Sequence, residues 1–170
     1  LRAYQINDDA SLLKTAIQAF NFLKVDVKDG GTRFTDEDGG IWLEEYPSTP
    51  HSFVLNGFIY AIFGIIDLYR VTGEAEVKVE MDIFLNTLLK NIRKFDCGYW
   101  SYYDLRRKEL VRFYYQKNVH APQMEILYQL TKEPVYDELA KKWRSKANRF
   151  NFIFVQIMYR VLPRYRKLFK

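Results

Sequence analysis

The sequence predicts a mainly all-α fold: an (α/α) barrel or toroid with short β-hairpins at one rim. Two observations predict it. Strongly apolar helical segments alternate along the chain with amphipathic ones, which is typical of folds in which outer helices surround inner helices. A hairpin segment also precedes the apolar helix in each half of the chain, so both hairpins are expected at the end where the inner helices begin. A plain helical bundle is the alternative.

The first half of the chain predicts a helix, a hairpin and two further helices. Asp8 or Asp9 can cap the first helix, whose apolar residues recur on one face. A glycine-containing turn separates two short strands, and the second strand is expected to continue through Tyr46. The next helix holds a 14-residue apolar run, too short for a membrane span and suited to a core helix ended by Gly73. The predicted elements, including the amphipathic helix that follows, are 8–23, 32–35, 41–46, 51–69 and 74–94.

The second half predicts another hairpin and two helices. Closely spaced aromatic residues at 99–103 predict a strand, and residues 110–115 predict its return strand. An inner helix is expected at 118–130. Pro134 stands at a favoured helix start, before a polar amphipathic helix at 135–147. This arrangement would bring residues 44–50 and 99–120 to one rim.

Composition narrows the class of protein. With 170 residues, 48% hydrophobic and 17% aromatic, the chain can bury one core and is not disordered. The net charge of +5 favours anionic partners such as an acidic polysaccharide or nucleic acid. Much of this charge lies in the last eleven residues, which leaves the body nearly neutral. The single cysteine, Cys97, excludes an intrachain disulfide and a cysteine metal cluster.

The first candidate cluster is Glu44, Glu45 and Tyr46. Adjacent residues of a strand point to opposite faces, so one carboxylate can face a site while the other faces solvent or an arginine. A pair of solvated strand carboxylates is the simpler alternative.

The second candidate cluster extends from Tyr102 to Arg106 and includes Tyr103 and Asp104. Arginine can bind a carboxylate through two parallel hydrogen bonds. A tyrosine beside such a cation can have a lowered pKa and act as an acid or base. A structural ion pair between Asp104 and Arg106 is the alternative.

The third candidate cluster extends from Tyr114 to His120 and leads into residues 123–127, which begin with Gln123. His51 and His120 are the only histidines, and each stands near the start of a predicted inner helix. Neither has a second histidine at zinc-ligand spacing, so no zinc site is predicted. The sequence also lacks a phosphate loop, a dinucleotide fingerprint and a serine nucleophile elbow.

These clusters, together with residues 53–58, resemble the C-terminal catalytic domain of the D-glucuronyl C5-epimerase family over residues 1–143. The resemblance implies an (α/α) barrel preceded by β-rich domains. It implies an isomerase that needs no metal or nucleotide cofactor. Its reaction would invert C5 of D-glucuronate to give L-iduronate in a heparosan- or heparan-type polysaccharide.

The resemblance also implies roles for individual residues. Tyr46, Tyr103 and Tyr115 would be catalytic, exchanging the C5 proton, with Glu45 as the carboxylate that accompanies Tyr46. The implied substrate-binding residues are Arg106, Asn56 and His120. Two departures from the family pattern concern the second and third clusters. Arg107 stands where the family commonly has histidine. The spacing from Tyr115 to His120 is one residue longer, with Gln116 where the tyrosine would fall, so Tyr114 is an alternative to Tyr115.

Two other functions stay open at this stage. One is an inactive or truncated polysaccharide-binding domain of the same fold. The other is a uronate polysaccharide lyase, which abstracts the same C5 proton but expels the C4 substituent. Of the partners considered, nucleic acid is not expected, whereas a homodimer stays open.

The expected domain organisation is a single barrel-type domain over residues 1–170. The chain begins at Leu1 without a methionine, with residues that resemble the end of a helix, so we expect a fragment of a longer protein. Residues 148–170 form an apolar and basic C-terminal extension. This extension is expected to be a packing helix, a partner surface or a segment that contacts a membrane surface.

Overall fold

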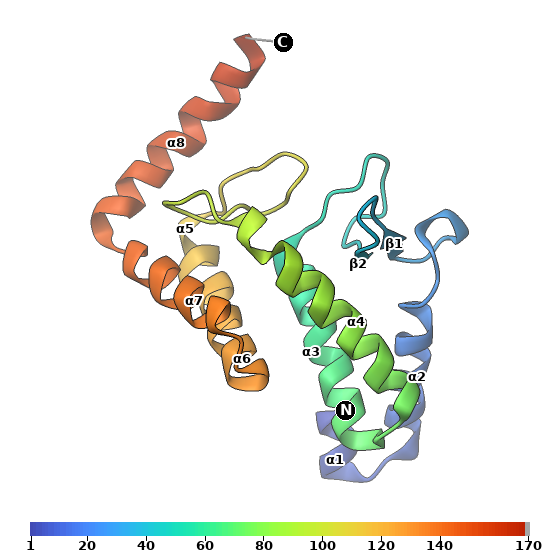
Figure 1. Cartoon of the computed structure of the whole chain (residues 1–170). Helices are drawn as coiled ribbons and strands as arrows, with labels where there is room; N and C mark the ends of the chain where they lie inside the picture. The colour runs from blue at the N-terminus through green and yellow to red at the C-terminus, as the bar shows by residue number, and fades with distance from the viewer. Residues whose placement is uncertain (169–170) are drawn as a thin grey trace. The chain divides into compact units, whose positions relative to one another are not determined.

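The computed structural model describes residues 1–168, with the side chains of residues 159, 160 and 162–168 left out, so most of the basic tail noted above lies outside the described side chains. The described chain is mostly helical with a two-stranded antiparallel sheet (Figure 1), which confirms the predicted helical class. It divides into two compact units. The first unit comprises Leu1–Arg93 and Asp104–Arg107, and the second comprises Lys94–Tyr103 and the residues from 108 onwards.

The first unit contains a helical pair, a hairpin and a second helical pair. Asp9 caps α2 by accepting a hydrogen bond from the backbone N–H of Ser11, as the sequence predicts. Gly73 ends α3 with φ 66°, a left-handed conformation that favours glycine. The elements are α1 (Arg2–Asn7), α2 (Ala10–Phe22), a 3-10 turn (Val27–Asp29), β1 (Arg33–Thr35), β2 (Ile41–Leu43), α3 (Leu55–Thr72) and α4 (Ala75–Asn91).

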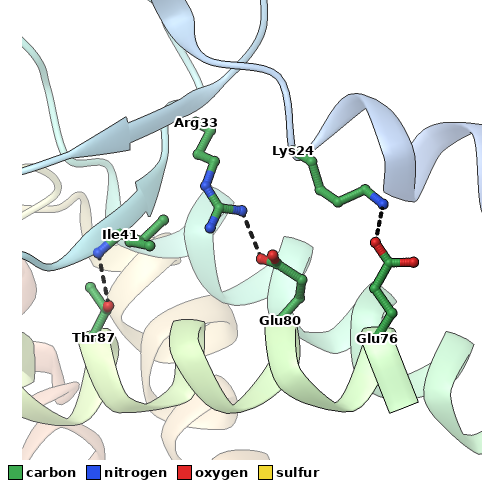
Figure 2. Close-up of polar contacts among 6 residues, drawn as sticks. All are labelled: Lys24, Arg33, Ile41, Glu76, Glu80 and Thr87. Atoms are coloured by element: carbon green, nitrogen blue, oxygen red, sulfur yellow. Dashed lines mark hydrogen bonds and ion pairs between the residues drawn. The ribbon is translucent and has the colours of Figure 1, made fainter. Parts of the chain in front are cut away.

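The hairpin is attached to α4 by polar contacts (Figure 2). The backbone N–H of Ile41 donates to Thr87 Oγ1 at 3.0 Å. Arg33 pairs with Glu80 at 2.7 Å, with both side chains largely buried. These contacts fix the strand β2 whose end leads into the candidate residues of the first unit.

Helix α3 is the core helix of the first unit. Leu55, Ile59 and Ile62 have no solvent exposure, and α3 lies beside α4 (Figure 1). Among the described helices, α3 alone is long and apolar enough to cross a membrane, by length and composition. Its buried face is that of a core helix, as the sequence predicts.

The second unit is built from helices and from a loop that contains isolated β-bridges. Its helices are α5 (Phe113–Tyr115), a π-helical turn (Gln116–His120), α6 (Ala121–Thr131), α7 (Pro134–Lys146) and α8 (Arg149–Leu168). Helices α6 and α7 lie side by side (Figure 1), and Pro134 begins α7 as predicted.

The predicted second hairpin forms only in part: its two segments pair antiparallel through one bridge, between Tyr102 and Leu110, and contain no regular strand. Only isolated bridges form in this region, Asp96 with Ser101 and Tyr102 with Leu110. The expected return strand at 110–115 becomes the helix α5 from Phe113. The aromatic residues that suggested a strand instead pack into a small core around Trp100, Val111 and Val155. Aromatic residues are enriched in strands, but what they require is burial, which this cluster supplies.

Candidate functional site

In the first unit, strand β2 ends at Leu43. The prediction that this strand continues through Glu44, Glu45 and Tyr46 is therefore wrong. Glu44 is buried, with 2% of its surface exposed. Its carboxylate accepts hydrogen bonds from the N–H and hydroxyl of Ser52, at 2.9 and 2.7 Å, and from the N–H of Phe53 at 3.0 Å. Glu44 therefore holds the loop that precedes α3.

This loop is conformationally strained. Phe53 has φ 55°, which a bulky side chain rarely adopts. Its ring lies edge-on to Trp42, with centroids 5.1 Å apart, and edge-on to Phe34. The Glu44 carboxylate and these two rings together enforce the conformation, as strained residues require.

Glu45 lies against the first turn of α3. A Cβ placed on Gly57 would be 2.4 Å from Glu45 Oε2, so the carboxylate occupies space that only glycine leaves open. Asn56 belongs to the same helical turn and is partly buried. Tyr46 follows Glu45 and is 56% exposed. The three candidates thus share the junction between β2 and α3, with the tyrosine toward solvent.

Arg106 joins this junction from a distant part of the chain. Its guanidinium donates to the carbonyl of Pro50 at 2.9 Å, and its side chain is exposed. Asp104 is buried, forms a bridge with Val54, and accepts a hydrogen bond from the N–H of Arg107 at 2.5 Å. Asp104 therefore holds the backbone segment that carries Arg106. The Arg106 guanidinium has further N–H groups that can donate to an anion.

In the second unit, the candidates Tyr103 and Tyr115 are in contact. Their rings lie edge to face, with centroids 6.3 Å apart and an interplanar angle of 89°. Tyr115 is 38% exposed, whereas the alternative Tyr114 is 66% exposed and lies edge-on to Tyr115. Tyr103 packs against the core around Trp100.

His120, in the π-helical turn, and Gln123, in α6, are both buried. His120 has no exposed surface, and its ring lies 5.8 Å from that of Trp143. Burial lowers the pKa of His120 to about 3, so the imidazole is neutral near pH 7. Its Nδ1 lies 2.8 Å from Ser101 Oγ, which also lies 2.5 Å from Gln116 Oε1.

Ser101 is absent from the sequence-based candidates, and Gln116 lies in the third cluster without an assigned role. Both are fully buried. In the sequence, Gln116 appeared only as a departure from the pattern that the resemblance implies. Gln116 begins the π-helical turn Gln116–His120, where each hydrogen-bonded ring spans one residue more than in an α-helix.

The candidates therefore form one group in each unit. The first unit holds Glu45, Tyr46, Asn56 and Arg106, and the second holds Tyr103, Tyr115 and His120. Among the described residues, no group of three or more His, Cys, Asp or Glu side chains is arranged to hold a metal ion.

Comparison with known proteins supports one family. A family model described as the D-glucuronyl C5-epimerase C-terminus matches residues 1–145. A D-glucuronyl C5-epimerase from Caenorhabditis elegans is 31% identical over 164 residues, covering 86% of this chain and 26% of that protein. An uncharacterized protein from Methanocaldococcus jannaschii is 34% identical over 146 residues, covering 84% of this chain and 47% of that protein. The chain thus spans between a quarter and a half of these relatives, and it belongs to the D-glucuronyl C5-epimerase C-terminal family.

Proposed function

We propose that this protein is an isomerase that inverts C5 of D-glucuronate to L-iduronate within an acidic polysaccharide. Membership of the epimerase C-terminal family supports the reaction class. The name of the Caenorhabditis elegans relative supports glucuronate as the sugar. The mostly helical chain is compatible with the (α/α) barrel that the resemblance implies, and we keep that architecture, as one domain over residues 1–170, within the proposal.

The reaction requires stabilisation of negative charge. The C5 proton lies next to a carboxylate and is very weakly acidic, so its removal needs a cation that neutralises the carboxylate and the enolate-like intermediate. Arg106 is our candidate for this cation. Support comes from its exposed guanidinium, of which one donor is engaged by Pro50 and the others can bind a carboxylate.

The reaction also requires one group to remove the proton and another to return it to the opposite face of C5. Tyrosine can act in either step, because its phenolate form can accept the C5 proton and its phenol form can donate one. We assign this work to Tyr46, Tyr103 and Tyr115. The observation that carries the proposal is the edge-to-face contact of Tyr103 with the half-exposed Tyr115, two residues chosen from sequence alone.

Glu45 and Asn56 are proposed to support Tyr46. Glu45 is adjacent to Tyr46 in the chain and its carboxylate lies against Gly57, in the helical turn that also carries Asn56. We propose that Glu45 orients or exchanges protons with the phenol of Tyr46, and that Asn56 contacts the sugar.

Replacing one phenol tests the proposed acid–base role. Tyr103→Phe keeps the ring that packs on the core around Trp100 but removes the hydroxyl. We expect C5 exchange on a glucuronate polymer to fall by roughly 100-fold or more, the usual contribution of a general acid or base. The measurement is deuterium incorporation at C5, followed by NMR with the full-length protein.

The matched control is Tyr60→Phe, which removes an exposed phenol from α3. Its exchange rate should equal that of the wild type. If Tyr103→Phe exchanged deuterium as fast as this control, Tyr103 would have no part in the reaction.

A further inference from the structure

A buried hydrogen-bond chain links the two segments that carry the paired tyrosines. Ser101 precedes Tyr103 by two residues, and Gln116 directly follows Tyr115. Ser101 Oγ contacts both Gln116 Oε1 and His120 Nδ1, and all three side chains are fully buried. The chain therefore connects the loop of Tyr103 to the π-helical turn next to Tyr115.

The geometry identifies the donor and the acceptor of each hydrogen bond in this buried hydrogen-bond chain. The 2.5 Å separation between Ser101 Oγ and Gln116 Oε1 suits an O–H···O bond, because N–H···O bonds are usually about 2.7 Å or longer. The amide oxygen can only accept, so the serine proton is donated to Gln116. His120 must then donate from Nδ1 to Ser101, which leaves its Nε2 unprotonated.

Backbone hydrogen bonds extend this connection to Tyr103. The N–H of Val111 donates to the carbonyl of Ser101 at 3.0 Å, and the N–H of Tyr103 donates to the carbonyl of Glu109 at 2.7 Å. Loop residues 101–103 are thus held by two sets of contacts. One is the pair of backbone hydrogen bonds, and the other is the buried hydrogen-bond chain through the Ser101 side chain. Loss of the Ser101 hydroxyl would leave the buried donor His120 Nδ1–H and the buried acceptor Gln116 Oε1 without their shared hydrogen-bond partner.

We propose that the chain His120 Nδ1–H to Ser101 Oγ–H to Gln116 Oε1 is a positioning device that holds Tyr103 and Tyr115 in their edge-to-face arrangement. The inference rests on the proposed function, because it is as proton-transfer groups that the tyrosines need this alignment. Ser101, Gln116 and His120 are positioning residues, since none of them has an exposed atom that could contact a polymer. A misplacement of about 1 Å can cost roughly 100-fold in rate, so a loosened pair should lower kcat.

Two substitutions of His120 separate positioning from sugar contact. The amide nitrogen of His120→Asn lies near the position of Nδ1 and can still donate to Ser101, whereas that of His120→Gln lies near Nε2 and cannot. We expect His120→Gln to lower kcat for C5 exchange on a glucuronate polymer by at least ~10-fold, with KM changed by less than ~3-fold. His120→Asn should recover most of the lost kcat.

Two substitutions of Ser101 provide a second, independent test. Ser101→Ala removes the central hydroxyl and should lower kcat as His120→Gln does, whereas Ser101→Thr keeps the hydroxyl and should restore it. Ser145→Ala, at an exposed serine of α7, is the control and should match the wild type. All rates are measured below the thermal unfolding midpoint of each variant, and the His120 pair decides the result if Ser101→Ala does not fold.

The outcomes separate the two proposals. A wild-type protein without C5 exchange would overturn the proposed function, and this inference with it. An active wild type with unchanged kcat in Ser101→Ala and His120→Gln would overturn the positioning device alone. Full activity in His120→Gln and loss in His120→Asn would also overturn it, because Nε2 and not Nδ1 would then be the working atom.

Discussion

At the scale of single residues, the two neighbouring carboxylates do different work. Glu44 is buried and uses its oxygens to hold Ser52 and Phe53, whereas Glu45 is exposed and lies over Gly57. A buried carboxylate needs such donors, because it gives up its hydration. Because Glu45 is exposed and adjacent to Tyr46 in the chain, we propose the catalytic role for Glu45 and a structural role for Glu44.

His120 makes the stability of the protein depend on pH. Its pKa is about 3 in the folded protein, against about 6.5 in an unfolded chain. Below pH 6.5 the unfolded chain therefore binds a proton that the folded protein does not, and the free energy of unfolding falls as pH falls from 6.5 toward 3. At pH 5 this contribution amounts to roughly 2 kcal/mol.

Urea unfolding of the wild type and of His120→Asn at pH 7.5 and pH 5 measures this contribution. The asparagine cannot titrate, so the stability difference between the two proteins should shift by roughly 2 kcal/mol in favour of the variant at pH 5. Carboxylates titrate in both proteins and cancel in the comparison. Parallel losses of stability in the two proteins would show that His120 is not buried as a neutral imidazole.

At the scale of elements, the first turn of α3 is shaped around Glu45. In Gly57→Ala the new methyl group would collide with the Glu45 carboxylate, which must move. The helix itself gains propensity worth about 1 kcal/mol from alanine, so stability should stay level or rise slightly. The rate of C5 exchange should nevertheless fall by at least ~10-fold, because the substitution displaces Glu45, the residue proposed to support Tyr46.

Gly64→Ala is the control for this element. It lies in the middle of the same helix, and a Cβ there would contact nothing within 4 Å. Its stability should rise by roughly 0.5–1 kcal/mol in urea unfolding, with an unchanged exchange rate. Equal exchange rates in the two alanine variants would remove Glu45 from the site.

Helix α8 contributes to the core that supports Tyr103, although it lies beyond the residues matched by the family model. Val155 is buried in the cluster with Trp100 and Val111, against which Tyr103 packs. Val155→Ala should therefore lower the free energy of unfolding by roughly 2 kcal/mol, through lost burial and the cavity left behind.

Ile153→Ala is the comparison on the same helix. Ile153 is 60% exposed, so its truncation should change stability by no more than about 0.5 kcal/mol in thermal or urea unfolding. Similar effects of the two substitutions would mean that α8 does not pack on this core through Val155.

At the scale of the whole molecule, the helices could be predicted from local signals. Asp9 as a cap, Gly73 as a left-handed terminus and Pro134 as a first residue each act within a few positions of the chain. The short hairpin followed from the glycines at its turn. These elements depend on neighbouring residues, which the sequence displays directly.

The site residues depended on contacts between distant positions. Ser101 meets Gln116 and His120 only after the chain folds, and no spacing rule connects them. Likewise, the burial of Glu44 is decided by backbone donors eight and nine residues later. The tyrosines could be named because the resemblance to the family implied them, whereas nothing in the sequence pointed to the residues that we propose hold them.

The central claim is that the protein epimerises glucuronate within a polymer. The most direct test incubates the full-length protein with heparosan in deuterated water and follows the C5 position by NMR. The proposed function predicts deuterium at C5 together with new L-iduronate signals, and no unsaturated product. An unsaturated uronate, detected by its ultraviolet absorbance, would identify a lyase instead. A folded protein that gives neither exchange nor iduronate on heparosan or on other glucuronate polymers would contradict the claim.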